Sequence, residues 1–272
     1  MHYDPIKKSL GNVFNKTPFL RKVFYKLLDL LLLRAWHVHK ELKLWASQNN
    51  KNVEILDAGM GFGQHTYYLS NYNDNWKILA VDVKDEQVED CKKFFNAIDK
   101  KNVHFEIADL TETAYFANKQ NKFDLALSVD VMEHILEDVL VFKNIVSSLK
   151  VGGMLLISTP SDQGGSDVND EDGTSFIEEH VRDGYNIKEI EDKLKSAGFS
   201  KVEARYSYGA PGKISWRLSM KYPIQILGVS KIFFLIIIPY YILTFPISYI
   251  LNWFDVNGKH TTGTGLIVKA WK

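Results

Sequence analysis

The segment Ile55–Gln64 carries three glycines, one at every second position, directly after an apolar run. The apolar run reads as a buried strand, and a helix is predicted to begin near Gln64. Glycine adopts positive φ at little cost and lets a ligand approach the backbone without a Cβ in between. The N-terminus of the following helix offers unpaired N–H groups and a partial positive charge. The segment therefore predicts a strand–turn–helix unit whose turn holds a carboxylate or a phosphate.

Short β-branched runs alternate with helical stretches from Val53 to about Ser207. This alternation predicts βαβ units, in which a parallel sheet carries helices on both faces. The predicted strands are Glu54–Asp57, Ile78–Asp82, Val103–Ala108, Phe123–Val129, Met154–Ser158, Val202–Tyr206 and, at the end of the chain, Thr264–Trp271. The predicted helices include Asp85–Ile98, Glu133–Leu149 and Ile187–Ala197. Gly164–Gly173 is predicted to be a loop at the edge of the sheet where open α/β folds bind ligands.

Acidic residues occur at the ends of the predicted strands. Asp57 stands two residues before the first glycine, in a G-x-G-x-G pattern that differs from the G-x-G-x-x-G of dinucleotide sites. Asp82, Asp109 and Asp130 lie at the ends of the second, third and fourth strands. This ordered set resembles the motifs of class I S-adenosylmethionine-dependent methyltransferases, in particular bacterial members of the type 11/12-like kind. The resemblance covers roughly Val53–Ser207 and the final strand.

The resemblance implies an α/β fold with a Rossmann-like, seven-stranded, mostly parallel sheet, whose last strand is antiparallel, and helices on both faces. It also implies S-adenosyl-L-methionine (SAM) as the cofactor and methyl transfer as the reaction. Asp82 would accept hydrogen bonds from the ribose hydroxyls, and Asp109 would face the adenine amino group beside the N–H of Leu110. The implied cofactor-binding residues are Asp57, Gly59, Gly61, Gly63, Asp82, Val83, Asp109, Leu110 and Asp130.

Candidate catalytic residues follow the fourth strand and precede the helix before the sixth strand. Methyl transfer to a hydroxyl or an enolisable carbon needs a general base, whereas a deprotonated amine needs little help. The candidates are His134, His180 and Tyr185. The run His-Val-Arg-x-Gly-Tyr resembles a feature of some bacterial family members, so His180, Arg182 and Tyr185 are predicted to line the acceptor pocket. The alternatives are a network that anchors this loop and, for His134, a position at a helix start without a role in proton transfer.

A metal site and a nucleic-acid site are not expected. Asp130, Glu133 and His134 have D-x-x-E-H spacing, similar to the E-x-x-E-H of some quinone-pathway O-methyltransferases with a divalent ion. Many metal-independent relatives share the Glu-His pair, so no metal is predicted.

The chain has 33 basic and 33 acidic residues, which argues against a general nucleic-acid binder. Its one cysteine, Cys91, is predicted to be a packed thiol on a helix.

The segment Tyr222–Phe254 is strongly apolar, with Lys231 as its only formal charge. If the final strand belongs to the same sheet, both ends of this segment lie on one domain. Two full membrane passes need about 40 apolar residues, which is more than the segment provides. Pro239 and Pro246 argue against one straight span. We therefore expect a helical hairpin that packs on the domain or on a dimer partner, lines an oily acceptor tunnel, or dips into one leaflet.

The sequence thus predicts three parts. They are an N-terminal helical extension at 1–50, a SAM-binding domain at 51–208 plus 262–272, and an apolar insert at 209–261. Within the extension, Thr17 and Pro18 are predicted to start a helix.

We expect methyl transfer to O, N or C of a small lipophilic acceptor at or near a membrane. The first residues lack the apolar run of a signal peptide, so the expected location is cytoplasmic, with peripheral contact at the inner face of the membrane. The alternatives are a sugar or envelope-polysaccharide precursor as acceptor, a nicotinamide-dependent oxidoreductase, and a non-catalytic SAM-binding scaffold.

Overall fold

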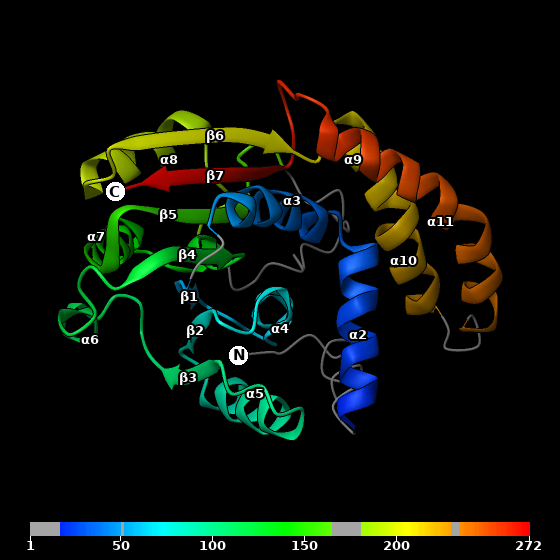
Figure 1. The fold of residues 1–272 in the computed structure, drawn as a ribbon. Helices are drawn as coiled ribbons and strands as arrows, with labels where there is room; N and C mark the ends of the chain where they lie inside the picture. The colour runs from blue at the N-terminus through cyan, green and yellow to red at the C-terminus, as the bar shows by residue number, and fades with distance from the viewer. Residues whose placement is uncertain (1–16, 50–51, 165–180, 230–233) are drawn as a thin grey trace.

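Seven strands form one mixed sheet in the order β3-β2-β1-β4-β5-β7-β6 (Figure 1). The computed structural model describes residues 17–49, 52–164, 181–229 and 234–272. The strands are β1 (Glu54–Ala58), β2 (Lys77–Asp82), β3 (Val103–Ile107), β4 (Phe123–Val129), β5 (Leu149–Pro160), β6 (Lys201–Ser207) and β7 (Gly265–Trp271). β1 to β5 pair in parallel, and β7 runs antiparallel to both β5 and β6. The predicted fold class, including the reversed last strand, is confirmed.

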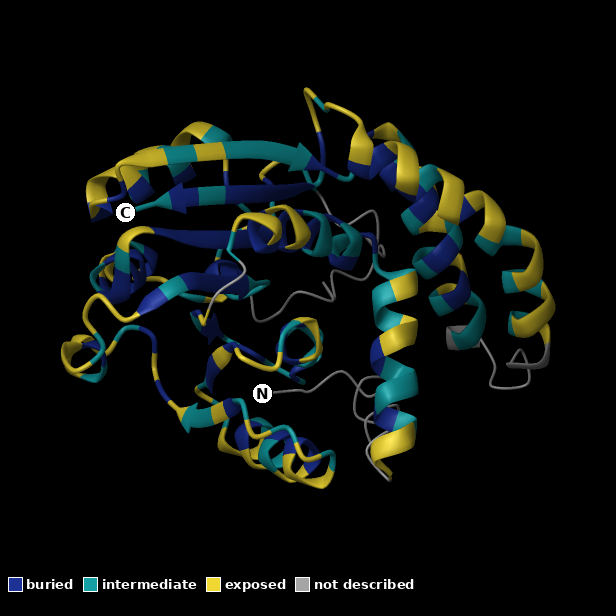
Figure 2. Cartoon of the chain, in the orientation of Figure 1, coloured by how far each residue is buried: buried dark blue, intermediate teal, exposed yellow. Residues whose placement is uncertain are grey.

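Helices cover both faces of the sheet, and each face has its own apolar core. On one face, α7 (Asp138–Ser148) and α8 (Ile187–Ala197) pack beside α6 (Thr113–Ala117). On the other face, α3 (Leu33–Gln48), α4 (Gln64–Tyr72) and α5 (Asp85–Ala97) pack around Trp76 and Phe95. Figure 2 shows the central strands as mostly buried, which is what a parallel sheet covered on both sides requires.

The structure differs from the sequence prediction after β4. A helix was predicted over Glu133–Leu149, but the chain forms a 3₁₀ turn, η1 (Met132–His134), and α7 starts only at Asp138. The side chain of Glu133 is buried and accepts a hydrogen bond from the Thr159 hydroxyl at 3.0 Å. Ile135 is extended, with φ −112° and ψ 121°. The inward position of Glu133 and the extended backbone at Ile135 therefore interrupt the predicted helix.

The N-terminal extension forms two helices. Thr17 caps α2 (Pro18–Leu31) by accepting a hydrogen bond from the Leu20 N–H, and Pro18 stands in the first turn, as predicted. The helix breaks at Leu32, where ψ is 110°, and α3 begins at the next residue. The hydroxyl of Tyr208, which follows β6, accepts a hydrogen bond from the Arg34 N–H in the first turn of α3. A residue far along the chain therefore caps this helix.

The apolar insert is a helical hairpin that extends from the sheet domain (Figure 1). Its outgoing arm consists of α9 (Ala210–Trp216), the π-helical turn η2 (Arg217–Lys221) and α10 (Tyr222–Val229), and its returning arm is α11 (Phe234–Asn257). α11 continues through Pro239 and Pro246, so these prolines do not end the helix. Among the described residues, one helix, Ile236–Asn257, is long and apolar enough to cross a membrane by length and composition.

The base of the hairpin is fixed to the sheet domain by Asp255. Its carboxylate is fully buried and accepts hydrogen bonds from the N–H groups of Tyr208 and Gly212 at 3.1 and 2.9 Å. The His37 ring of α3 lies 2.8 Å from the same carboxylate. These contacts hold the pKa of Asp255 below its usual value, chiefly through the hydrogen bond with His37, although burial acts in the opposite direction. The two ends of the insert therefore lie on one domain, as expected.

Candidate active site

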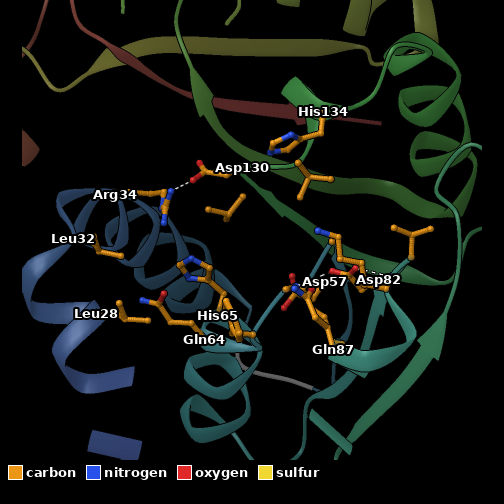
Figure 3. A pocket seen from close by; sticks show the side chains of 18 of the residues that line it. Leu28, Leu32, Arg34, Asp57, Gln64, His65, Asp82, Gln87, Asp130 and His134 are labelled. Carbon is orange, nitrogen blue, oxygen red and sulfur yellow. Dashed lines mark hydrogen bonds and ion pairs between the residues drawn. The ribbon is translucent and has the colours of Figure 1, made fainter. Parts of the chain in front are cut away.

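The glycine turn after β1 forms the floor of a cavity of about 1230 Å³ (Figure 3). Gly59, Gly61 and Gly63 all have positive φ, at 84°, 53° and 74°. A Cβ on Gly59 would lie 2.3 Å from a methyl carbon of Val131, so this position allows no side chain. A Cβ on Gly61 would meet nothing within 4 Å, because this glycine lies at the open space of the cavity. Gly63 packs against the Cys91 thiol of α5 and does not line the cavity.

Asp57 lies beneath the glycine turn, at the end of β1. The residue is 3 % exposed, and its carboxylate accepts a hydrogen bond from the Thr66 hydroxyl of α4. Burial raises the pKa of Asp57 to about 7, the Thr66 hydrogen bond opposes the rise, and the nearby Asp82 adds to it. A cationic ligand group beside this carboxylate would favour its ionised form. The geometry therefore suits a ligand with a positive charge near the glycine turn.

Asp82 ties the end of β2 to the glycine turn. Its two carboxylate oxygens accept hydrogen bonds from the N–H groups of Gly61 and Lys84, at 2.9 and 3.0 Å. Asp82 and its neighbour Val83 both line the cavity. Further along this edge, Asp109 and Leu110 follow β3 and line the same cavity. The carboxyl ends of three adjacent strands thus bring the predicted cofactor residues together.

Asp130 and His134 lie on the far side of the cavity from the glycine turn (Figure 3). Asp130 directly follows β4, has a φ of 52°, and forms an ion pair with Arg34 of α3. His134 lies in η1 and its side chain is exposed at the cavity wall. Of the three residues with D-x-x-E-H spacing, Glu133 is turned into the core. Among the described residues, no group of His, Cys, Asp and Glu side chains is arranged to hold a metal ion.

The N-terminal helices form a cover over the glycine turn. Arg21 of α2 is buried, and its guanidinium donates to the Phe62 carbonyl at 3.0 Å and to the Asp90 carboxylate at 2.6 Å. The Tyr25 hydroxyl also donates to the Phe62 carbonyl. These bonds fix α2 on the backbone of the turn itself. The sequence contains one signal for this contact. Arg21 interrupts the apolar face of its helix, where a cation without a partner is costly.

His65 is a further cavity residue that the sequence analysis missed. It lies in the first turn of α4, and burial, with the nearby His39 and Arg34, lowers its pKa well below the usual value. Its Nδ1 is buried without a hydrogen-bond partner in the described part of the chain. An unpaired buried nitrogen is expected to find a partner when the site is filled. Together with the open face of Gly61, it indicates that this end of the cavity fits a polar ligand such as SAM.

Arg182 and Tyr185, predicted to line the acceptor pocket, lie outside the cavity. Tyr185 is fully buried, and its hydroxyl donates to the carboxylate of Asp138 at 2.7 Å. Arg182 and Lys193 pair with the same carboxylate, at 2.5 and 2.8 Å. The two residues thus form the loop-anchoring network that the sequence analysis kept as an alternative, and the structure does not bring them to the cavity. His180 and most of the predicted loop at 164–173 lie outside the described residues.

Residues 49–205 match the family model described as a methyltransferase domain. The match spans more than half of the chain and includes every cofactor position described above. This chain belongs to the methyltransferase domain family. The predictions of a methyltransferase and of SAM as its methyl donor are confirmed.

Two curated relatives match this chain over part of their own length. Phosphoethanolamine N-methyltransferase 1 of Triticum aestivum is 30 % identical over 152 residues, 56 % of this chain and 29 % of the relative. Malonyl-[acyl-carrier protein] O-methyltransferase 1 of Ilyobacter polytropus is 26 % identical over 123 residues, 45 % of this chain and 44 % of that protein. This chain therefore spans less than half the length of either relative.

A solved structure shows the same fold. It is Haemonchus contortus phosphoethanolamine N-methyltransferase 2 in complex with phosphomonomethylethanolamine and S-adenosylhomocysteine. Its TM-score is 0.59 at 19 % identity, over 86 % of this chain and 52 % of that one. At this identity the likeness shows the arrangement of sheet and helices only. The acceptor of this chain is therefore inferred from its own cavity.

Proposed function

We propose that this protein transfers the methyl group of SAM to O, N or C of a small lipophilic acceptor at or near a membrane. The observation that carries the proposal is the wall of the cavity beyond the glycine turn. This wall is built by apolar side chains of α2 and of the outgoing arm of the hairpin, namely Leu28, Leu31, Trp216, Met220 and Ile224. One arm of the insert therefore lines the acceptor end of the cavity. The other arm, α11, carries an exposed apolar face.

The size of the cavity fits two ligands. Pockets for one small molecule measure about 300–1,000 Å³, and this cavity, at about 1230 Å³, exceeds that range. In the proposed arrangement, SAM occupies the end formed by Gly61, Asp82 and Asp109, and the acceptor occupies the apolar end. Because the sulfonium makes the methyl group electrophilic, the protein's main task is to align the acceptor with the C–S bond.

His134 is the proposed general base for an acceptor that must lose a proton. It lies in η1, directly after β4, and its imidazole is exposed at the cavity wall. An acceptor hydroxyl or carbon acid would need such a base, whereas an amine would not. The two relatives are named for an N- and an O-methyltransferase. The family is therefore compatible with either acceptor atom, and our proposal leaves the atom open.

The test supplies SAM labelled in its methyl group to the purified protein, with a lipid extract and an aqueous extract of the host cells in separate reactions. We expect label in the organic phase of the lipid reaction. The Gly61→Ala variant, whose new methyl group occupies cofactor space, serves as the negative control. Label in aqueous, sugar-bearing material would support the alternative acceptor. SAM binding without transfer in either reaction would support a non-catalytic scaffold.

A further inference from the structure

Tyr208, the residue that follows β6, has a left-handed backbone with a φ of 55°. Among the described residues other than glycine, positive φ also occurs at Asp99, Asn121 and Asp130. Aspartate and asparagine enter this conformation more readily than other side chains, whereas it is strained for a bulky residue. Tyrosine is therefore the unexpected residue of this set. Strain of this kind is typical of positions where the surrounding structure holds a functional side chain.

Two hydrogen bonds hold the Tyr208 backbone in place. Its N–H donates to the Asp255 carboxylate at 3.1 Å, and its carbonyl accepts from the Thr264 N–H at 3.3 Å. The next residue is Gly209, where a Cβ would lie 2.2 Å from the His260 ring, so the chain is closely packed on this side. The two ends of the insert therefore fix the strained residue, and the fold sets the direction of its side chain.

Tyr208 lines the cavity together with Arg34 of α3 and Trp216 of the outgoing arm. Its hydroxyl accepts a hydrogen bond from the Arg34 N–H at 2.9 Å. The guanidinium of Arg34 pairs with Asp130, and the chain continues from Asp130 into η1, which carries His134. Arg34 therefore connects the Tyr208 hydroxyl with the segment of the proposed general base.

The Tyr208 hydroxyl has a proton left to donate. A phenol has one proton and two lone pairs, and the Arg34 N–H uses one lone pair. Within the described part of the chain, this N–H is the only hydrogen-bond partner of the hydroxyl. A bond accepted from an amide also strengthens the hydroxyl as a donor. An oxygen atom of a bound molecule would therefore complete its hydrogen bonding.

The hydroxyl keeps its proton at neutral pH. Burial raises the pKa of Tyr208, the charge and the N–H of Arg34 oppose the rise, and Asp255 adds to it. The ring of His37 also faces Tyr208, at 6.4 Å between ring centroids. Burial lowers the pKa of His37, so this neighbour stays neutral. Tyr208 is thus a neutral donor at the cavity wall.

A donor at this place favours an acceptor that is methylated on oxygen. An amine attacks the methyl group through its single lone pair, and a hydrogen bond donated to that lone pair would block the attack. An oxygen accepts the bond and keeps a further lone pair for the methyl group. An ionised oxygen gains most, because a hydrogen bond to an anion is stronger than one to a neutral group.

A phenolic or enolic hydroxyl suits the base at this site. A phenol such as the tyrosine side chain has a pKa of about 10 and an imidazole has one of about 6.5, so the proton would move to His134 against a gap of about 3.5 units. One hydrogen bond donated to the ionised oxygen lowers the pKa of the acceptor by about one to two units. Tyr208 would thus narrow the gap that His134 has to overcome.

We propose that Tyr208 donates its hydroxyl proton in a hydrogen bond to the oxygen that receives the methyl group, and that the acceptor is a lipophilic phenol or enol. The inference rests on the proposed function and deepens it by naming the acceptor class and the methylated atom. The acceptor O–H bond breaks and its proton moves to the His134 imidazole. The oxygen then forms the O–C bond while the C–S bond breaks, and its electron pair stays on sulfur in S-adenosylhomocysteine.

The test uses 4-nitrophenol, whose absorbance reports its ionisation, bound to the full chain together with S-adenosylhomocysteine. Because this product carries no methyl group to transfer, the measurement reports only the state of the probe. We expect the pKa of 4-nitrophenol to fall when it binds to the unmodified protein. In Tyr208→Phe the pKa of the bound probe should lie about one to two units higher than in the unmodified protein.

The matched control is Tyr206→Phe, which removes a hydroxyl that accepts from the Gln163 side chain outside the cavity. It should leave the pKa of the bound probe unchanged, and both variants should bind S-adenosylhomocysteine with unchanged affinity, which shows that they fold. An equal probe pKa in Tyr208→Phe and the unmodified protein would overturn the inference. Failure of 4-nitrophenol to bind the unmodified protein, or binding without a fall in its pKa, would overturn it without any variant.

A second measurement compares 4-hexylphenol with 4-hexylaniline as acceptors of labelled methyl from SAM. Tyr208→Phe should lower kcat/KM for the phenol by about tenfold or more and should not lower it for the aniline. Faster transfer to the aniline by the unmodified protein would overturn the acceptor class. Transfer to sugar-bearing aqueous material would contradict the proposed function, whereas the ionisation of bound 4-nitrophenol tests Tyr208 without any transfer.

Discussion

The guanidinium of Arg34, in the first turn of α3, pairs with the carboxylate of Asp130, the residue that follows β4. The pair joins the N-terminal helices to the edge of the sheet where the cofactor residues gather (Figure 3). Both side chains line the cavity, and each is 32 % exposed. The cover over the glycine turn is thus fixed at two places, by Arg21 on the turn itself and by Arg34 at the end of β4.

Replacing Arg34 with glutamine should weaken SAM binding modestly. A partly exposed ion pair contributes less than about 1 kcal/mol, so we expect a two- to fivefold rise in the dissociation constant, measured by calorimetry. Lys26→Gln, which removes an exposed cation from α2, is the matched control and should leave the affinity unchanged. An Arg34→Gln protein that binds SAM as tightly as the unmodified protein would show that the pair does not support the cofactor site.

The sequence predicted the sheet and the cofactor edge because their signals are local. Glycine spacing, β-branched runs and acids at strand ends are read within ten or so residues, and the structure brings Asp57, Asp82, Asp109 and Asp130 to one cavity. The break at Leu32 left no such signal, since neither glycine nor proline marks it. Its cap comes from Tyr208, whose position depends on the whole sheet.

The acceptor side was harder to predict for the same reason. Arg182 and Tyr185 were predicted to line the pocket because their sequence context resembles a family feature. In the structure both side chains donate hydrogen bonds to the buried carboxylate of Asp138. The inverted polarity of α11 was also hidden. In the sequence, apolar residues appear all around the helix, and the polar stripe of Ser248, Asn252 and Asp255 gains meaning only once the other arm lies against it.

Asp57→Asn should stabilise the free protein at alkaline pH. Burial raises the pKa of Asp57 from its ordinary value to about 7, so its stabilising contribution is fully present below pH 4 and is lost as the pH rises through 7. Above that point the folded protein holds a buried carboxylate, and removing it should raise the free energy of unfolding by up to about 4 kcal/mol. Thermal unfolding at pH 4 and pH 8.5 measures the difference, which should be small at pH 4. Asp183→Asn, at an exposed position, should show no such pH dependence.

The same carboxylate should make SAM binding depend on pH. The positive charges of SAM favour the ionised form of Asp57, so below about pH 7 binding must displace a proton. We expect the dissociation constant to rise as the pH falls from 8 to 6, by at most about tenfold per unit. Asp57→Asn should bind SAM more weakly at pH 8, and its affinity should vary less with pH. A profile as steep as that of the unmodified protein would assign the titration to another group.

Tyr185→Phe should destabilise the protein without changing cofactor binding. The change removes one hydrogen bond to the buried Asp138 carboxylate, which keeps Arg182 and Lys193 as partners. The expected loss in the free energy of unfolding is about 1–2 kcal/mol, measured with denaturant. Tyr72→Phe, at a residue that is 43 % exposed, is the control and should have little effect. Unchanged stability together with lost methyl transfer would restore Tyr185 to the acceptor site.

Gly61→Ala separates the ligand role of the glycine turn from its structural role. At this position φ is 53° and a Cβ meets nothing within 4 Å, so the added methyl group should cost only the strain of the left-handed backbone, about 1 kcal/mol. The methyl group enters cofactor space, and we expect SAM affinity to fall at least about tenfold. Gly152→Ala is matched to it, since Gly152 has a φ of 79° and equally open surroundings away from the cavity. Both variants should lose similar stability, and only Gly61→Ala should lose SAM binding, which calorimetry measures. Equal SAM affinity in the two variants would mean that the open face of Gly61 does not receive the cofactor.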